Sequence, residues 1–237
     1  MPSEKRDGRL LGGLLLLQLA GLIVPFIMLS TVATPGFLPA AAGSAGQIRV
    51  AVLLLLANSA LTTAIAIILY PRFRTTSPGL ARWLVVLGGG MIALQAVDNS
   101  QVMEMLALSQ AYGAAGSQDA GPMFDVLGPV SAATRRAAHY SVLLVIEAWM
   151  LVFYTACWRA RVVPWILPAF GVLAAALHVI GATLPVFLGT RSMAPLTMVL
   201  AVSHIALALW LIVRGFEVRH PHRTLAQSIE GATPARD

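Results

Sequence analysis

The sequence has few charged residues, one cysteine and one lysine, and each scarcity excludes a class of protein. Only 11% of the 237 residues are charged and 58% are hydrophobic, whereas an average soluble domain carries about 25% charged residues. With a mean hydropathy of +0.79, the composition excludes a soluble enzyme, a nucleic-acid-binding module and a disordered chain. The single cysteine, Cys157, excludes an intrachain disulfide and a cysteine-pair metal site. The single lysine, Lys5, lies outside every hydrophobic segment, so a buried Schiff-base chromophore is excluded too.

What the chain does contain is a series of long hydrophobic segments. A bilayer core about 30 Å thick is crossed by around 20 apolar residues in a helix. The sequence therefore predicts an all-α, polytopic membrane bundle, with residues 10–216 as the transmembrane domain between an N-terminus of residues 1–9 and a tail of residues 217–237. Six segments satisfy the length requirement: 10–30, 48–70, 83–106, 137–158, 164–187 and 193–213.

The basic residues predict the orientation of this bundle. Cytoplasmic loops of membrane proteins are enriched in Lys and Arg. If both termini are cytoplasmic, only Arg49, Arg135, Arg136 and Arg191 of the 16 basic residues lie outside. The same orientation makes the loops 31–47 and 107–136 external. Within the second loop, the apolar segment 123–127 is expected to lie on the membrane surface, to cover the bundle as a lid, or to belong to a disordered loop.

Several apolar stretches resemble a bacterial membrane family, the domain-of-unknown-function 4386 family. The resemblance implies a multi-pass bacterial membrane protein and supplies no catalytic residues. Four stretches carry it: Ala64-Ile65-Ala66-Ile67-Ile68-Leu69-Tyr70, the segment from His139 to Arg161 with its Arg159-Ala160-Arg161-Val162-Val163-Pro164 exit, Trp165-Ile166-Leu167-Pro168-Ala169-Phe170-Gly171, and Ala208-Leu209-Trp210-Leu211-Ile212-Val213-Arg214-Gly215-Phe216.

Polar residues inside the predicted spans are the candidates for function. A charged residue at mid-membrane costs about 2.5–3.5 kcal/mol on insertion scales, so such residues normally face the bundle and find a partner. Glu147, His178 and His204 lie close to the midpoints of their spans, and Asp98 lies nearer the outer leaflet. We expect Glu147 or Asp98 to pair with His178 or His204 in one cavity that opens outward.

Three further residues are expected to complete this ligand-binding or proton-relay set. Asn58 and Gln95 are expected to orient it by hydrogen bonding, and His139 is expected to face the outer mouth of the cavity. Amides in membrane helices also serve as plain interhelical hydrogen-bond partners. Glu104, at the outer end of its span, is expected to face water or to pair with Arg135 or Arg136.

Three functions are compatible with these residues. A carboxylate–histidine set can relay protons while the protein binds or moves a small or amphipathic ligand. It can also provide acid–base or metal chemistry for an intramembrane enzyme acting on a lipid-like substrate. The third alternative is a structural or assembly partner without chemistry of its own, so the sequence does not decide whether the protein is an enzyme.

These functions also determine which cofactors and partners are expected. A metal such as zinc or iron held by Glu147, His178 and His204, or a haem between the two histidines, is an alternative, but no cofactor is predicted. The expected partners are the lipid bilayer of a bacterial inner membrane and a small-molecule or lipid-like ligand, without nucleic acid. A homo-oligomer is compatible with the sequence.

Overall fold

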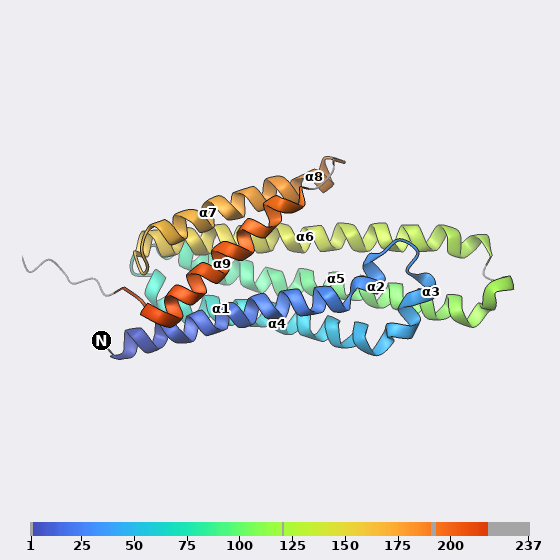
Figure 1. Cartoon of the computed structure of the whole chain (residues 1–237), viewed down its shortest axis with the longest axis horizontal. Helices are drawn as coiled ribbons and strands as arrows, with labels where there is room; N and C mark the ends of the chain where they lie inside the picture. The colour runs from blue at the N-terminus through green and yellow to red at the C-terminus, as the bar shows by residue number, and fades with distance from the viewer. Residues whose placement is uncertain (1, 120, 191–192, 218–237) are drawn as a thin grey trace, which may run out of the picture.

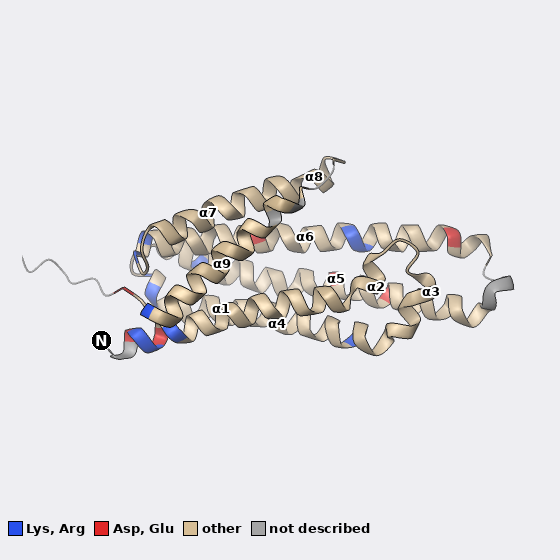
Figure 2. Cartoon of the chain, in the orientation of Figure 1, with Lys and Arg blue, Asp and Glu red and all other residues tan. Residues whose placement is uncertain are grey.

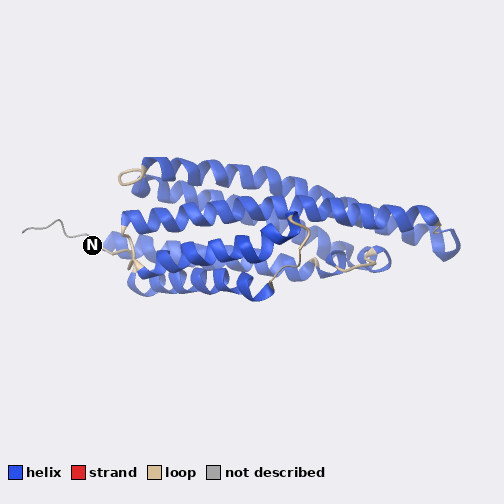
Figure 3. Ribbon diagram, turned by 90° about the horizontal axis from the view of Figure 1, so that it is seen from above, coloured by secondary structure: helices blue, strands red, loops and turns tan. Residues whose placement is uncertain are grey.

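The structure, a computed structural model, describes residues 2–119, 121–190 and 193–217. The part of the chain that it describes is helical, with short connecting loops and no strand (Figure 3). The elements follow in the order α1 (Pro2–Met28), α2 (Ser30–Ala33), α3 (Leu38–Ala41), η1 (Ala42–Ser44), α4 (Ala45–Phe73), α5 (Pro78–Asp119), α6 (Pro122–Ala160), α7 (Ile166–His178), η2 (Val179–Thr183), α8 (Leu184–Phe187) and α9 (Ala194–Arg214). Most of the predicted tail, residues 218–237, lies outside the described residues.

Five of these helical segments are long and apolar enough to cross a membrane, and a shorter apolar helix follows at Met198–Arg214. The chain is therefore a multi-pass membrane protein. The helices cover most of each predicted span, and α4, α5 and α6 extend beyond their spans at both ends, whereas α1 ends at Met28, before the predicted end at residue 30. The sixth predicted span corresponds to α9, whose qualifying apolar stretch is shorter than that of the other five.

The six main helices form a closed ring. In chain order, α1, α4, α5, α6, α7 and α9 each pack against the next, and α9 packs against α1. The contact between α9 and α1 is close, because a Cβ at Gly12 would lie 2.6 Å from the carbonyl oxygen of Ala208. The first and last helices of the described residues therefore lie side by side.

Large side chains from α6 fill the ring in the half that lies towards the N-terminus (Figure 1). Trp149, Phe153 and Tyr154 are fully buried. The rings of Trp149 and Phe153 stack with centroids 5.1 Å apart, and the Trp149 indole N–H donates to the carbonyl oxygen of Leu84 on α5 at 3.2 Å. This half of the bundle is therefore a packed core.

The long helices α5 and α6 extend past the rest of the ring at the end far from the N-terminus (Figure 1). They have 42 and 39 residues, about 63 and 58 Å at 1.5 Å per residue, roughly twice the thickness of a bilayer core. The segment 107–119 and the segment 122–136, expected to form an external loop, are instead turns of these helices. In particular, residues 123–127 form the start of α6.

Tertiary contacts hold this helical extension in place. The Ser109 hydroxyl donates to the carbonyl oxygen of Leu38 at 2.5 Å and accepts from the backbone N–H of Ala42 at 2.8 Å. The rings of Tyr112 and Phe124 meet edge to face, with centroids 5.5 Å apart. The short helices α3 and η1 thus pack against the extension.

The basic side chains gather at the end of the bundle where the N-terminus lies, apart from those on the outer parts of α4 and α6 (Figure 2). The predicted orientation places this end of the bundle in the cytoplasm, and it stays a prediction. At the same end, the Arg72 guanidinium lies 3.9 Å from the centre of the Phe216 ring and 3.6 Å from the Glu4 carboxylate.

Candidate functional site

The carboxylate of Asp98 is buried between α5 and α6, with 1% of the residue exposed. His139 Nδ1 lies 3.3 Å from its Oδ2, and Arg135 Nε lies 3.4 Å from its Oδ1. The arginine contact is an ion pair without the alignment of a hydrogen bond. A buried carboxylate is thus held by a cation and an imidazole that both come from α6.

Two amides support Asp98 on its own helix. Gln95 donates to Asp98 Oδ2 at 3.4 Å and to Asn99 Oδ1 at 3.0 Å. Asn99 then donates to the carbonyl oxygen of Val52 on α4 at 2.9 Å. The orienting role expected of Gln95 is compatible with these contacts, which link α4, α5 and Asp98.

A second carboxylate, Glu147, is buried between α6 and α7, with 1% of the residue exposed. Its Oε1 lies 2.7 Å from His178 Nδ1 and accepts a hydrogen bond from the Thr183 hydroxyl. Its Oε2 is buried without a hydrogen-bond partner. Glu147 and His178 are one of the pairs expected from the sequence.

The helix that carries His178 changes its winding directly after this residue. Val179–Thr183 form a π-helical turn, and Thr183, the other partner of Glu147, ends that turn. Such turns are rare and often occur at functional sites. The π-turn brings both partners of Glu147, five residues apart, to one carboxylate oxygen.

His204 on α9 belongs to a separate polar cluster. The residue is 2% exposed, and its Nδ1 lies 3.3 Å from the Tyr154 hydroxyl, which also lies 3.4 Å from the Ser203 hydroxyl. The ring of Tyr154 packs on Gly171 of α7, where a Cβ would lie 2.1 Å from it. His204 therefore joins α9 to α6 and contacts neither Asp98 nor Glu147.

The remaining amides connect α1 and α4. Gln18 donates to the Thr62 hydroxyl at 2.6 Å, and Thr62 donates to the carbonyl oxygen of Asn58 at 3.0 Å. The Asn58 side chain lies against Gly21, where a Cβ would be 2.6 Å from its Oδ1. Asn58 is thus part of a helix contact rather than a neighbour of the carboxylates.

The four ionisable residues expected in one cavity are therefore divided among three clusters. Asp98 pairs with Arg135 and His139, Glu147 pairs with His178, and His204 pairs with Tyr154. Glu104 was expected to face water or to pair with Arg135 or Arg136. Instead, Glu104 accepts a hydrogen bond from the Ser131 hydroxyl at 3.3 Å.

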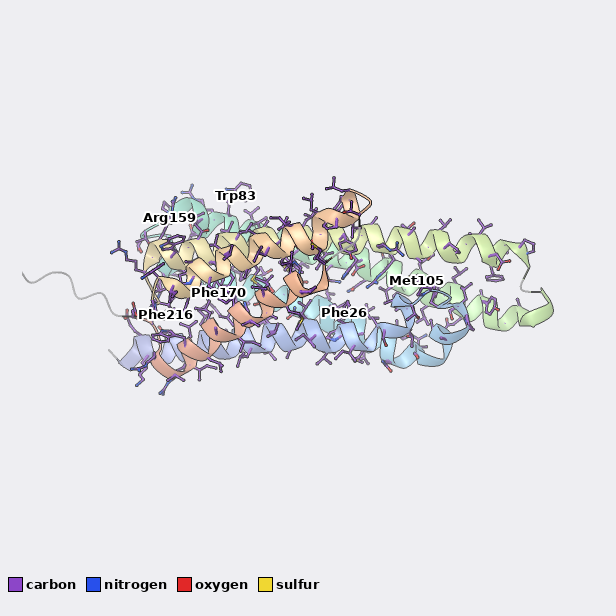
Figure 4. The ribbon with its side chains drawn as sticks, turned by 45° about the horizontal axis from the view of Figure 1, so that its top comes forward. Phe26, Trp83, Met105, Arg159, Phe170 and Phe216 are labelled. Carbon is purple, nitrogen blue, oxygen red and sulfur yellow. The ribbon has the colours of Figure 1, made fainter. Side chains whose placement is uncertain are left out.

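A cavity of about 660 Å³ lies next to the Asp98 cluster, and we call it the α1–α6 cavity. Its walls come from the end of α1, the segment 32–38, α5 and residues 124–140 of α6. Phe26 and Met105, labelled in Figure 4, line it from α1 and α5. Arg135 and His139 belong to its wall and also contact Asp98.

The described residues contain no group of three His, Cys, Asp or Glu side chains placed to hold a metal ion. The three ligands of the alternative metal site are thus not gathered in one group: His178 bonds to Glu147, whereas His204 lies beside Tyr154.

Comparison with known proteins gives one family match. The family model described as a domain of unknown function (DUF4386) matches residues 10–215. No curated protein and no solved structure is significantly similar to the chain.

Proposed function

The chain belongs to the DUF4386 family of unknown function, and from this starting point we propose that it binds or moves a small or amphipathic ligand through the α1–α6 cavity, with coupling to a proton. The site of action is proposed to be a bacterial inner membrane, with both termini in the cytoplasm. One observation carries the proposal: Arg135 and His139 line the cavity and also contact the buried carboxylate of Asp98.

The cavity has the features of a ligand site. Its volume of about 660 Å³ falls in the range of about 300–1,000 Å³ that is usual for small-molecule sites. Such sites combine apolar walls with a few polar groups that orient the ligand. Here Phe37, Met105 and Phe124 provide apolar wall, and Arg135, Arg136 and His139 provide cationic or titratable groups.

Proton coupling follows from the contact between His139 and Asp98. Imidazole is the side chain whose ordinary titration lies between about pH 5 and 8. The proposed coupling rests on a general effect: a negative charge bound beside an imidazole favours its protonated form, and a positive charge favours its neutral form. Apart from Arg135, no other charged side chain pairs with Asp98 or His139 among the described residues.

The Glu147–His178 pair provides a second protonatable site on the same helix. Glu147 follows His139 by eight residues, about 12 Å along the axis of α6. In the proposed relay, this pair is the second proton-binding site, deeper in the bundle than the Asp98 cluster. We include Asp98, His139, Glu147 and His178 in the proposed relay, with Gln95 as the residue that orients Asp98.

Ligand binding is tested with the purified protein in phosphatidylcholine nanodiscs. Dansyl-labelled amphiphiles with acidic, neutral and basic headgroups are titrated, and at least one should gain fluorescence on entering the cavity. Ala133→Trp fills the cavity and should abolish the gain. Ala137→Trp, on an exposed position of the same helix outside the cavity wall, is the matched control. Absence of binding by every probe, or equal loss in both variants, would refute the proposal.

Proton coupling is tested with the probe that binds most tightly. In weakly buffered solution, a pH-indicator dye should report a proton taken up or released on binding. His139→Gln should retain binding and lose the proton change. If His139→Gln leaves the proton change intact, the coupling does not pass through this residue.

A further inference from the structure

We propose that the ligand of the α1–α6 cavity is an anionic single-chain amphiphile whose acidic headgroup binds Arg136. This inference rests on the proposed function and names its ligand class. The apolar chain of the ligand lies along the α6 wall towards Phe124. Three observations carry the inference: the shape of the cavity, the distribution of charge on its wall and its position relative to the predicted membrane.

The cavity is elongated along α6. Its lining residues on this helix run from Phe124 to Tyr140, which corresponds to about 24 Å along the helix axis. Between these ends, Phe37 and Met105 add buried apolar wall. An elongated apolar wall fits a hydrocarbon chain better than it fits a compact polar solute.

The charges on the wall favour an acidic headgroup. Arg135 is paired with Asp98, but Arg136 is exposed and has no ion-pair partner among the residues that the structure describes. The wall contains one described carboxylate, that of Asp125. It lies eleven residues before Arg136, about 16 Å away along α6. One end of the cavity therefore offers an unpaired cation.

The position of the cavity suits a ligand that comes from the membrane. Phe26, which is 61% exposed, lies within the first predicted span, and Arg136 lies at the edge of the fourth. Arginine at this edge is at the depth of lipid headgroups. Beyond Arg136 the cavity continues past Phe37, where α2 and α3 pack against α5. A chain that lies there is outside the predicted bilayer core and contacts the apolar wall formed by Phe37 and Phe124.

The test compares three dansyl-labelled fatty compounds that share one chain: the acid, the neutral amide and the amine. Each is titrated into the full-length protein in phosphatidylcholine nanodiscs. A hydrogen bond to a charged group is worth about 1.5–3 kcal/mol, so the acid should bind at least about tenfold more tightly than the amide. Arg136→Gln should remove this difference, while Arg136→Lys should retain most of it.

Arg49→Gln is the matched control, because it removes an exposed arginine from α4, outside the cavity wall. It should leave all three affinities unchanged. Thermal unfolding of each variant, followed through the buried Cys157 thiol, identifies a folding defect. Displacement of the probe by an unlabelled fatty acid or by a lysophosphatidate then distinguishes a carboxylate from a phosphate headgroup.

The outcomes separate the ligand class from the proposed function. If acid and amide bind equally and Arg136→Gln changes neither, the anionic class is wrong, although binding that Ala133→Trp blocks still supports a ligand cavity. If no probe binds, both proposals fail. If the acid binds but neither competitor displaces it, the headgroup assignment is overturned.

Discussion

Gly171→Ala should destabilise the protein markedly, because the Tyr154 ring of α6 packs directly on this glycine of α7. A Cβ at Gly171 would lie 2.1, 2.3 and 2.4 Å from Cδ1, Cε1 and Cγ of Tyr154. Ordinary carbon contacts are about 3.5–4.0 Å, so ring and helix would have to separate by more than about 1 Å. The Tyr154 ring is fully buried and its hydroxyl lies near His204 and Ser203, so it cannot turn aside freely.

The expected magnitude is the difference between two effects. Overpacking in a well-packed core costs about 1–3 kcal/mol, and a severe overlap with a buried ring belongs at the upper end. Replacing glycine by alanine within a helix stabilises the folded protein by about 1 kcal/mol. The net loss of about 2 kcal/mol corresponds to a decrease in Tm of about 4–8 °C for a chain of this size.

The assay uses the single cysteine of the chain. Cys157 is 2% exposed, so a fluorogenic maleimide reports unfolding on heating without an introduced label. Gly90→Ala is the matched control, since a Cβ there meets nothing within 4 Å, and its Tm should stay the same or increase slightly. In a Tyr154→Ala background, Gly171→Ala should cost little further stability. A Gly171→Ala variant as stable as the wild type would refute the close approach of α6 and α7.

Two further predictions concern the second carboxylate and the orientation of the chain. Glu147→Ala leaves His178 without its buried acceptor, which should lower the free energy of unfolding by about 1–3 kcal/mol, measured with the same maleimide assay. Glu147→Gln should be less destabilising because it keeps an acceptor. Equal stability of the wild type and both variants would contradict the pairing. A cysteine at exposed Ala114, in the extension of α5, should react with a membrane-impermeant maleimide in intact cells, whereas one at Thr75, between α4 and α5, should react only after lysis. The reverse pattern would mean that the predicted orientation is wrong.

Hydropathy predicted the membrane helices but not how far they extend. Gly121, Pro122, Gly128 and Pro129 suggested a loop, since glycine and proline are the usual helix breakers. In the structure Pro122 begins α6, where its missing N–H is not needed, and Leu38 of α3 lies on Gly128. These contacts come from segments far apart in the sequence, so a local pattern does not show them.

The candidate site was only partly predicted, because its contacts also join segments that are far apart in the sequence. The mid-membrane positions of Glu147 and His178 indicated that two ionisable groups needed partners, and the two residues do pair. The contact of Arg135 with Asp98 was missed because Arg135 was counted as an external residue. Its long side chain reaches inward by several ångströms. The π-turn after His178 was also missed, because apolar periodicity does not reveal a change in helix winding.

The contact between α1 and α9 has a consequence for biosynthesis. During translation the first helix enters the membrane nearly 200 residues before its final neighbour is made. Until then the face of α1 that contains Gly8 and Gly12 has no native partner, because that partner is residues 208–216. The contact that closes the ring of helices therefore involves the helix that was synthesised first. A ribosome stalled before residue 194 would leave α1 at an open edge, with its glycine face towards lipid or towards the helices of another membrane protein.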